Sequence, residues 1–387
     1  MKINNVSCVD NCYGCFACQT FCPKQAISFK LNNQGFFAPF IDSNKCSNCG
    51  LCLKKCNEIH NMPLSEVQAT YYGWSKDKKI RNSSSSGGAF YSIAKSFIES
   101  GGVVAGASLI DPYNVKHIIV ETIDDLALLQ KSKYIQSDIS DFYHDVLFYL
   151  KSNKKVLLCG TPCQIAAAKV ILKNFSKQMF YIDLVCYGFI NNGLYETFLK
   201  GLEQINKQQI TSVEFRNKEY GNKMVIKSNE KVLYSCNYRE STNLGFYQQF
   251  INRQLIKETC DNCNFCSKSR VGDITLSDYP YSMSQEIDKD KLGVSVIYVN
   301  NKNGETLLNL LNDFHLCGTS DDIISVFSKR ILYPNSEKAF NDYLKYSKKP
   351  KSYAKKIINF KNTRNFTIVN ELFVLFKKSV KKLMDNN

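Results

Sequence analysis

Two cysteine runs near the N-terminus constrain this chain more than any other feature of its sequence. The run from Cys12 to Cys22 has the spacing C-x2-C-x2-C-x3-C and is followed by Pro23, and the run from Cys46 to Cys56 repeats that spacing. Nine of the 17 cysteines lie in the first 56 residues. Because the N-terminus has no apolar signal-peptide core, we expect a cytoplasmic, reducing location, where thiols ligate metals more often than they form disulfides.

This spacing is typical of bacterial ferredoxins, which hold two 4Fe–4S clusters. Three closely spaced thiolates wrap one corner of a cubane, and the fourth, three residues further on, points toward the other cluster. We therefore predict two ligand sets, one of Cys12, Cys15, Cys18 and Cys56, and one of Cys46, Cys49, Cys52 and Cys22. The alternative is a pair of zinc sites, although zinc modules usually use two separated C-x2-C pairs with four ligands in all.

The pattern after this module (residues 1–65) predicts a second domain over 66–335. Strand patterns alternate with helix patterns, which indicates an α/β unit with a largely parallel sheet, so the whole chain is of mixed α+β and α/β class. The expected strands are 71–74, 103–110, 115–120, 155–159 and 180–186, and the main expected helices are 89–99, 138–151 and 163–172. Residues 211–240 read as β-rich, and 336–387 as a basic helical tail with an amphipathic helix at 368–383.

Two loops of the second domain have features of ligand sites. The segment 82–88 (NSSSSGG) leads into a helix, so its small side chains, backbone N–H groups and the helix dipole could bind a phosphate, although it also fits a flexible connection. It matches neither the dinucleotide fingerprint nor a P-loop. The segment 160–164 (GTPCQ) lies between a strand and a helix, where open α/β sheets bind ligands. Its alternative is a well-capped connection, with Thr161 as N-cap and Pro162 at the first helical position.

A third cysteine run, Cys260, Cys263 and Cys266, lacks the fourth cysteine of the pattern. Three thiolates need a fourth ligand from elsewhere, and the candidates are Cys163, which we place in the predicted set, and Cys186. Each of these two ends or follows a predicted strand, where ligand-bearing loops gather. A structural zinc knuckle is the alternative for this run.

The charge of the chain is concentrated at its C-terminal end. Lys and Arg outnumber Asp and Glu by 50 to 35, giving +15, but +10 of this comes from residues 345–387. This distribution makes nucleic-acid binding an unfavoured interpretation. The basic tail could contact a membrane surface or an acidic partner, or form a solvated helix. No apolar run reaches the roughly 20 residues that a transmembrane helix needs.

The motifs together, in this order, resemble the family of coenzyme F420 hydrogenase/dehydrogenase beta subunits over about residues 1–335. Besides the three cysteine runs, the resemblance rests on SSSGGAF at 84–90, SKYIQS at 132–137, GTPCQIA at 160–166, DLVCYG at 183–188 and DIT at 273–275. One segment departs from the family. Where the family usually reads Gly-Asp-Phe-Trp-Gly, residues 276–281 read LSDYPY, so use of the deazaflavin coenzyme is in doubt.

The resemblance implies an iron–sulfur flavoprotein that passes electrons between 4Fe–4S clusters and FAD. It implies that FAD is lined by Ser84, Ser85, Ser86, Gly87, Gly88, Lys133, Tyr134, Gln136, Ser137, Gly160, Thr161, Pro162 and Gln164. Some bacterial members are linked with surface-polysaccharide biosynthesis or pyruvyl transfer. We therefore expect an oxidoreductase that reduces or oxidises a small organic substrate, with a ferredoxin-like or other redox protein as partner. The alternative is an electron-transfer subunit of a larger hydrogenase or dehydrogenase complex, using coenzyme F420.

Overall fold

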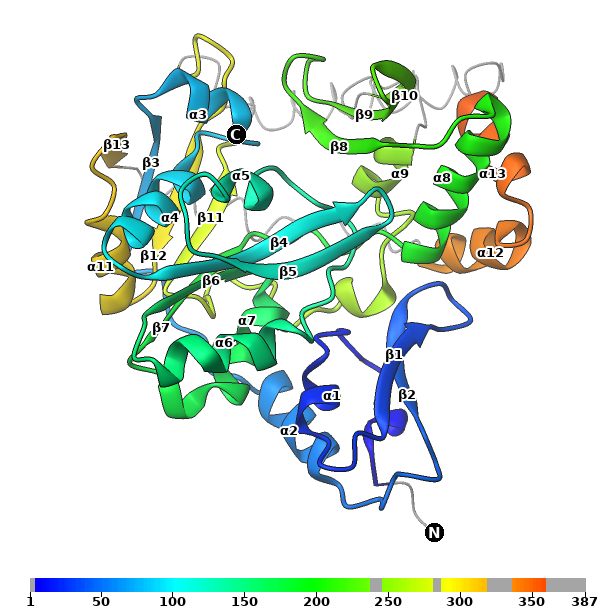
Figure 1. Ribbon diagram of the computed structural model, residues 1–387, viewed down its shortest axis with the longest axis horizontal. Helices are drawn as coiled ribbons and strands as arrows, with labels where there is room; N and C mark the ends of the chain where they lie inside the picture. Colours follow the sequence, from blue (N-terminus) through cyan, green and yellow to red (C-terminus); the bar gives the residue numbers. More distant parts are fainter. Residues whose placement is uncertain (1–3, 237–245, 281–286, 319–335, 360–387) are drawn as a thin grey trace, which may run out of the picture.

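An eight-stranded sheet runs through the main body of the protein (Figure 1). The computed structural model describes residues 4–236, 246–280, 287–318 and 336–359, so the helix expected at 368–383 lies outside the described residues. In spatial order the strands are β13 (Phe314–Gly318), β3 (Ala69–Ser75), β12 (Ser295–Val299), β11 (Ile274–Asp278), β7 (Met179–Leu184), β6 (Val156–Gly160), β4 (Val103–Asp111) and β5 (Asn114–Val120).

The sheet is mixed, with a parallel centre. The neighbours β4, β6, β7 and β11 are parallel, whereas every other pairing in the sheet is antiparallel. The expected parallel arrangement therefore holds for the four central strands. Val156, Leu157 and Leu158 of β6 are fully buried, as a central parallel strand with both faces covered requires.

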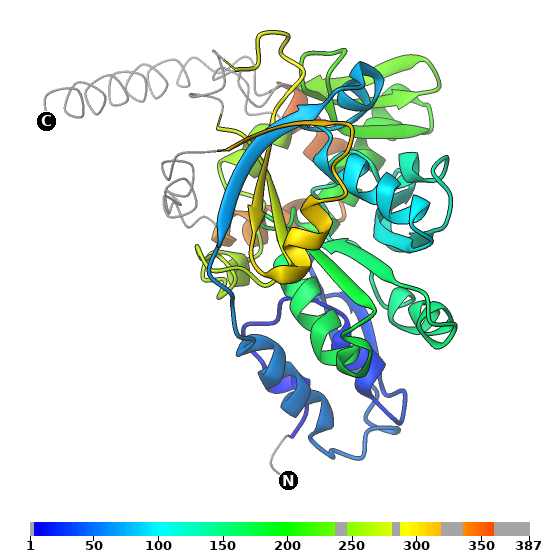
Figure 2. The ribbon, with the colours of Figure 1, turned by 90° about the vertical axis from the view of Figure 1, so that its left-hand side faces the viewer.

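Helices cover both faces of the sheet (Figure 2). On one face, Leu157 belongs to a core shared with α4 (Ala89–Glu99), α5 (Leu126–Leu129) and α11 (Lys302–Leu308). On the other face, Val156 and Leu158 pack in a core shared with α6 (Phe142–Lys151) and α7 (Pro162–Ile171). Side chains that alternate along β6 thus enter two separate cores, as the period of a strand dictates.

The N-terminal module lies at one end of the body and packs on it (Figure 1). It comprises η1 (Val6–Cys8), α1 (Ala17–Phe21), the antiparallel hairpin β1 (Ile27–Leu31) and β2 (Phe37–Ile41), and α2 (Leu51–His60). Tyr13, Phe16 and Ile59 of the module are buried in the same core as Ile165 of α7. This shared core fixes the module against the start of α7, next to the 160–164 segment.

A second, smaller unit packs beside the large sheet. It contains the antiparallel strands β8 (Ser212–Asn217), β9 (Lys223–Ser228) and β10 (Lys231–Cys236), with α8 (Asn192–Asn206), α9 (Phe246–Ile251), α12 (Ser336–Tyr346) and α13 (Pro350–Asn359). The remaining short elements are α3 (Lys78–Ser83), η2 (Lys173–Phe175) and η3 (Glu258–Cys260). Tyr353 and Ala354 of α13 are fully buried, so this part of the 336–387 segment belongs to the main core.

Most predicted elements occur within a residue or two of their expected bounds, with two differences. The helix expected at 138–151 begins only at Phe142, because Asp138 instead exchanges backbone hydrogen bonds with β5, accepting from His117 and donating to Val115. The strand expected at 180–186 ends at Leu184, after which Val185 donates to the carbonyl of Leu276.

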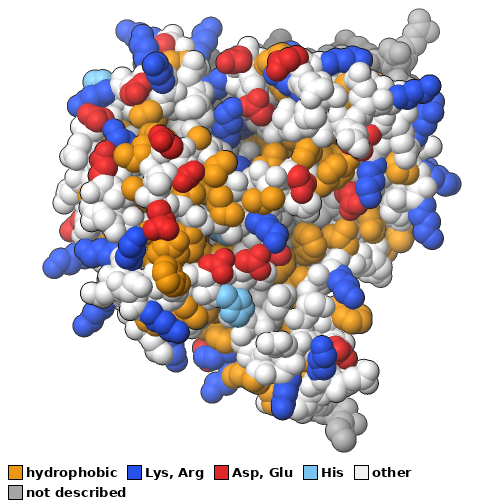
Figure 3. Space-filling model, viewed as in Figure 1, with side chains coloured by type: hydrophobic (Ala, Val, Ile, Leu, Met, Phe, Trp, Pro, Cys, Tyr) orange, Lys and Arg blue, Asp and Glu red, His pale blue; other side chains and the backbone are white. Residues whose placement is uncertain are grey.

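Charged side chains of both signs are interspersed on the face shown in Figure 3, with many Lys and Arg side chains at its edges. Apolar side chains gather across the middle of this face. The charge there is mixed and does not form a continuous basic stripe. Within the described ranges, no helix combines the length and apolar character required to cross a membrane.

The contact between α8 and α13 depends on Gly201. A Cβ atom there would lie 2.2 Å from the carbonyl oxygen of Pro350 and 2.6 Å from Cβ of Ala354. We expect Gly201→Ala to lower the free energy of unfolding by about 1–3 kcal/mol, because overpacking outweighs the better helix propensity of alanine. Urea denaturation measures this change.

The control is Gly318→Ala in β13, where no atom of the described residues, apart from its chain neighbours, lies within 4 Å of the added Cβ. This variant should unfold within about 0.5 kcal/mol of the parent. Equal destabilisation by both substitutions would contradict the proposed close packing of α8 on α13.

Candidate functional site

The first predicted thiol set is brought together by the fold. Cys12, Cys15, Cys18 and Cys56 line one cavity of about 20 Å³. Burial, with the charges of neighbouring thiols, raises the pKa of Cys15 and Cys56 to about 12. Thiolates in this position therefore require a positively charged group among them, which is what a bound metal cluster supplies.

The second predicted set lies in a more exposed part of the module. The pKa of Cys52 is raised by burial and by the charges of Cys22 and Cys46, so these three thiols are neighbours. Cys49 is exposed, and a hydrogen bond from the backbone of Leu51 lowers its pKa. In the described part of the chain, no three His, Cys, Asp or Glu side chains converge on the position of a single metal ion. The thiols of the first set surround a space, as the ligands of a multi-atom cluster do.

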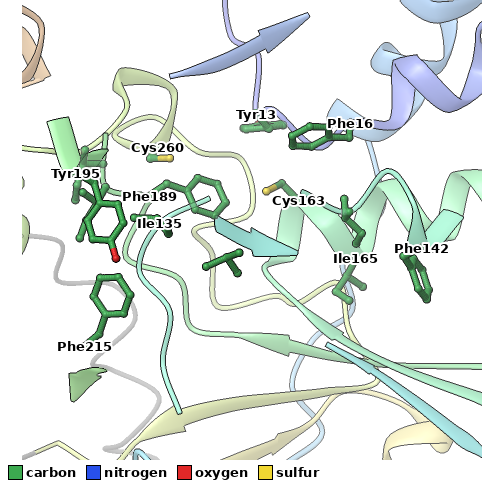
Figure 4. Close-up of a cluster of buried hydrophobic side chains, with 14 of the residues drawn as sticks. Tyr13, Phe16, Ile135, Phe142, Cys163, Ile165, Phe189, Tyr195, Phe215 and Cys260 are labelled. Atoms are coloured by element: carbon green, nitrogen blue, oxygen red, sulfur yellow. The ribbon is translucent and has the colours of Figure 1, made fainter. Parts of the chain in front are cut away.

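The third cysteine run lies beside both of its candidate partners. Burial and the charges of Cys263 and Cys186, in that order, raise the pKa of Cys163 well above its usual value. The sulfur atoms of Cys163 and Cys260 point toward one another across the space below Tyr13 (Figure 4). The backbone N–H of Gly188 lies 3.4 Å from Sγ of Cys186. Residues 163, 186, 260 and 263 thus form a third thiol group. Cys266, the last predicted ligand of the run, follows on the same loop, where its backbone N–H donates to the carbonyl of Cys263 at 3.0 Å.

Tyr13 lies between the first and third thiol groups. Its ring lines the cavity of the first group and stacks on His60 with centroids 4.4 Å apart. Its hydroxyl accepts a hydrogen bond from the backbone N–H of Asn264, 3.4 Å away. Asn264 stands between Cys263 and Cys266 in the sequence. Burial first, and then the charges of Cys263, Cys163 and Cys260, raise the Tyr13 pKa. The two thiol groups are therefore direct neighbours.

Two buried arginines hold the loop that carries the third run. Arg270 pairs with Asp183 at 2.7 Å and donates to the carbonyl of Ser267 at 3.1 Å. Arg253 pairs with Asp261 and donates to the carbonyl of Cys260 at 3.4 Å. Each guanidinium donates hydrogen bonds both to a carboxylate and to carbonyl groups of the loop, and these bonds fix the loop to the sheet.

A larger cavity of about 300 Å³ opens at the carboxyl ends of the parallel strands. This edge of an open α/β sheet is where ligands usually bind. Of the residues expected to line a flavin, it is lined by Ser84, Ser85, Ser86, Gly88, Lys133, Tyr134, Ser137, Gly160, Thr161 and Gln164. Cys186 lines it as well, so the cavity adjoins the third thiol group.

Three expected residues, Gly87, Gln136 and Pro162, are not among its lining residues. A Cβ at Gly87 would lie 2.4 Å from the carbonyl oxygen of Gly73, so this glycine packs against β3. The side chain of Gln136 turns toward the N-terminal module and donates to the carbonyls of Tyr13 and Gly14. Pro162 is the buried first residue of α7, where the capping box that Thr161 forms with Gln164 begins the helix.

The sequence did not point to His117, which lines this cavity. Its Nδ1 lies 3.1 Å from Oγ of Ser137 and its Nε2 lies 3.2 Å from the carbonyl oxygen of Cys159. Gln164 donates to the same Ser137 hydroxyl at 2.9 Å. Burial lowers the pKa of His117 to about 4, so its ring is neutral at pH 7. Val115 and His117 are two residues apart on β5 and are both buried, so they lie on the same face of the strand. This spacing is the signal that would have placed His117 on the buried face.

Lys133 is the side chain of the cavity that is best suited to bind an anion. Its ammonium donates to the carbonyls of Leu128 and Gln130, and no carboxylate within the described residues pairs with it. Burial lowers its pKa to about 7. Ser85 accepts from the backbone and hydroxyl of Ser132 at 2.8 and 2.9 Å, which holds the serine loop beside this segment at the start of α4. A half-buried lysine next to a helix N-terminus fits a phosphate-bearing cofactor.

Comparison with known families supports the sequence resemblance. Residues 70–143 match the N-terminal model of the coenzyme F420 hydrogenase/dehydrogenase beta subunit, and residues 153–320 match its C-terminal model. Residues 11–58 match the 4Fe–4S dicluster domain.

Individual relatives are distant. One subunit of the F(420)H(2) dehydrogenase from Methanosarcina mazei is 20% identical over 225 residues, which are 55% of this chain and 64% of the relative. Ferredoxin-type protein NapF from Haemophilus influenzae is 40% identical over 42 residues, 11% of this chain and 24% of the relative. The chain thus spans less than two thirds of either relative. A chain of the F420-reducing [NiFe] hydrogenase complex from Methanosarcina barkeri aligns with a TM-score of 0.46 at 16% identity, over 74% of this chain and 91% of that one.

The third thiol group predicts which cysteine completes a third cluster. After anaerobic reconstitution we expect about twelve irons per chain, four for each of three clusters. Cys163→Ser should lower this to about eight, because among the neighbouring charges that of Cys263, in the third run, raises the Cys163 pKa most. Iron and sulfide analysis provides the measurement.

The matched control is Cys159→Ser, which removes a half-buried thiol that lines the neighbouring cavity. The charges that shift the pKa of Cys159 are those of Asp183 and Lys133, not those of the third cysteine run. It should keep the full iron content. Loss of iron in Cys186→Ser together with full iron in Cys163→Ser would make Cys186 the ligand and contradict this prediction.

Proposed function

The chain belongs to the family of coenzyme F420 hydrogenase/dehydrogenase beta subunits, and from this premise we propose that it is an iron–sulfur flavoprotein that serves as the electron-transfer subunit of a larger redox complex. Its N-terminal 4Fe–4S dicluster domain makes it an iron–sulfur protein of a redox enzyme family. The bound FAD, the third cluster and the assembly into a complex are the parts of this account that we propose.

The observation that carries the proposal is the unbroken series of sites. The first thiol group meets Tyr13, Tyr13 meets the third thiol group, and Cys186 of that group lines the large cavity. Short steps between centres are what electron transfer through a protein requires. A cavity that stood apart from the thiol groups would have favoured separate functions for the two domains.

The residues of the cavity fit FAD. Lys133 and the backbone at the start of α4 would hold its pyrophosphate, because both attract negative charge and neither has a carboxylate partner in the described structure. Gly160, Thr161 and the Ser137–His117–Gln164 network would line the ring, with neutral His117 held by Ser137. FAD would supply the exchange of electron pairs for single electrons, which 4Fe–4S clusters carry one at a time.

The chain's own residues would set the conditions for that exchange. The buried ion pairs of Arg270 and Arg253 hold the third run rigidly, which would keep a cluster bound there at a fixed separation from the cavity. A hydrogen bond to a ligand sulfur, such as the one from the backbone N–H of Gly14 to Sγ of Cys12 at 3.3 Å, would tune the potential of a cluster bound there.

A self-contained oxidoreductase acting on an organic substrate, as in surface-polysaccharide biosynthesis, is the second candidate. The observation in its favour is that Leu276, Ser277 and Asp278, part of the segment that departs from the family pattern, line the cavity. A changed wall at this position suits a substrate other than the deazaflavin coenzyme. In either case a ferredoxin-like or other redox protein would exchange electrons through the N-terminal clusters.

Anaerobic reconstitution with iron, sulfide and FAD tests the proposal. We expect at least about eight irons and one flavin per chain, with both reducible by dithionite. A protein that binds zinc and no flavin would contradict it. An isolated chain that oxidises NADH or another two-electron donor at high rate would favour the self-contained enzyme over the subunit.

The Lys133 ammonium predicts a pH-dependent affinity for FAD. Free Lys133 has a pKa of about 7, and a bound anion raises that pKa, so the anion binds best when Lys133 is protonated. We expect the FAD dissociation constant to rise about tenfold from pH 6 to pH 8. Flavin fluorescence quenching measures it.

Lys133→Met should bind weakly and with little pH dependence, whereas Lys133→Arg, which stays charged, should bind tightly at both pH values. An unchanged pH profile in Lys133→Met would show that another group is responsible.

A further inference from the structure

One corner of the large cavity contains an arginine with most of its donors unused. Arg216 of β8 lines the cavity and its side chain is only 14% exposed. In the described structure its one hydrogen bond runs from Nη1 to Oδ2 of Asp278, and its Nε has no partner. The Asp278 side chain is 52% exposed, so the carboxylate of this pair faces solvent while the guanidinium is covered.

Positively charged side chains outnumber negatively charged ones around this corner. Lys131, Lys133 and Arg216 line the cavity, and Lys131 is paired with Glu214. Asp278 is the acidic residue of the lining. If the phosphates of FAD pair with Lys133, the guanidinium of Arg216 is still unneutralised. Its five N–H donors then have only the solvated carboxylate of Asp278 as a partner among the described residues. A covered guanidinium of this kind can accept a second anion.

Aromatic rings adjoin the same corner. Tyr134, Tyr187 and Phe250 line the cavity. The ring centroids of Tyr134 and Phe250 are 4.8 Å apart, and those of Tyr187 and Phe250 are 5.6 Å apart. Phe215, which precedes Arg216 in β8, contacts the Tyr134 ring with centroids 5.6 Å apart, so Tyr134 lies beside this part of β8. The corner therefore combines apolar ring faces with a directed positive charge.

We propose that this corner is the substrate subsite and that it selects a planar organic anion, whose negative group binds Arg216 while its ring packs on Tyr134 and Tyr187, which Phe250 supports from behind. The inference rests on the proposed function, because it places the substrate in the cavity that would hold FAD. Asp278 is a competitor for Arg216 in this account. It lowers the affinity for the anion and disfavours anions that pair less well with the guanidinium.

Two redox-inert probes of the same size and shape test the proposal without any turnover. 2-Naphthoate is a planar anion, and 2-naphthamide is its neutral counterpart. Calorimetric titration into the flavin-loaded, reconstituted protein should show naphthoate binding about tenfold more tightly, since a charge-assisted hydrogen bond is stronger than a neutral one.

Three variants separate the contribution of charge from that of shape. Arg216→Gln should abolish the preference for naphthoate and leave naphthamide binding unchanged. Arg216→Lys should keep part of the preference, because lysine retains the charge but not the planar fork. Asp278→Asn should tighten naphthoate binding several-fold, a gain of function that misfolding cannot mimic.

Equal affinity of the two probes for the parent protein would overturn the inference. Release of FAD by naphthoate would also overturn it, because the probe would then occupy the cofactor's part of the cavity. Unchanged naphthoate binding in Asp278→Asn would also overturn it. Failure of the proposed function is distinguishable, because in that case the protein takes up no flavin in the reconstitution step, before any probe is added.

Discussion

The cost of burying thiolates governs the architecture of this protein. Burial raises the pKa of Cys15, Cys18, Cys56 and Cys163, and within each group the neighbouring thiols raise it further. Deprotonated thiols in these positions are unfavourable until iron and sulfide provide compensating positive charge. Metal loading and the final packing of the module on the body are therefore expected to be coupled, since Tyr13 and Phe16, which flank Cys15, form part of the main core.

Several contacts between the two parts of the chain go to the backbone of the first cysteine run. Gln136 donates to the carbonyls of Tyr13 and Gly14, and the Tyr143 hydroxyl donates to the carbonyl of Cys15 at 3.1 Å. Gly14, at φ +67°, leaves room for the Gln136 amide where a Cβ would lie 2.2 Å from its Nε2. Because residues on either side of Gln136 line the large cavity, one segment contacts both the cluster loop and the cofactor region.

Local signals in the sequence predict the elements that carry this site, and long-range contacts account for what they miss. The helix expected at 89–99 occurs with those bounds, and Thr161 and Pro162 begin α7 as their residue types indicate, because caps and periodicity are local properties. The roles of Arg270 and Arg216 depend on carboxylates 87 and 62 residues away, which no pattern within one element reveals. The same holds for the direction of Gln136, whose neighbours in sequence face the cavity while it faces the module.

The measurement that tests the central claim most directly is the rate at which electrons given to the clusters reach the flavin. Reconstituted protein is mixed with a one-electron donor, and bleaching of the flavin's visible absorption is followed by stopped flow. A double variant, Cys260→Ser with Cys263→Ser, removes the third thiol group but leaves the N-terminal module intact. The account predicts fast bleaching in the parent and bleaching slower by orders of magnitude in the variant, with flavin content unchanged. Equal rates in the two proteins would contradict it, because electrons would then reach the cavity without the third group.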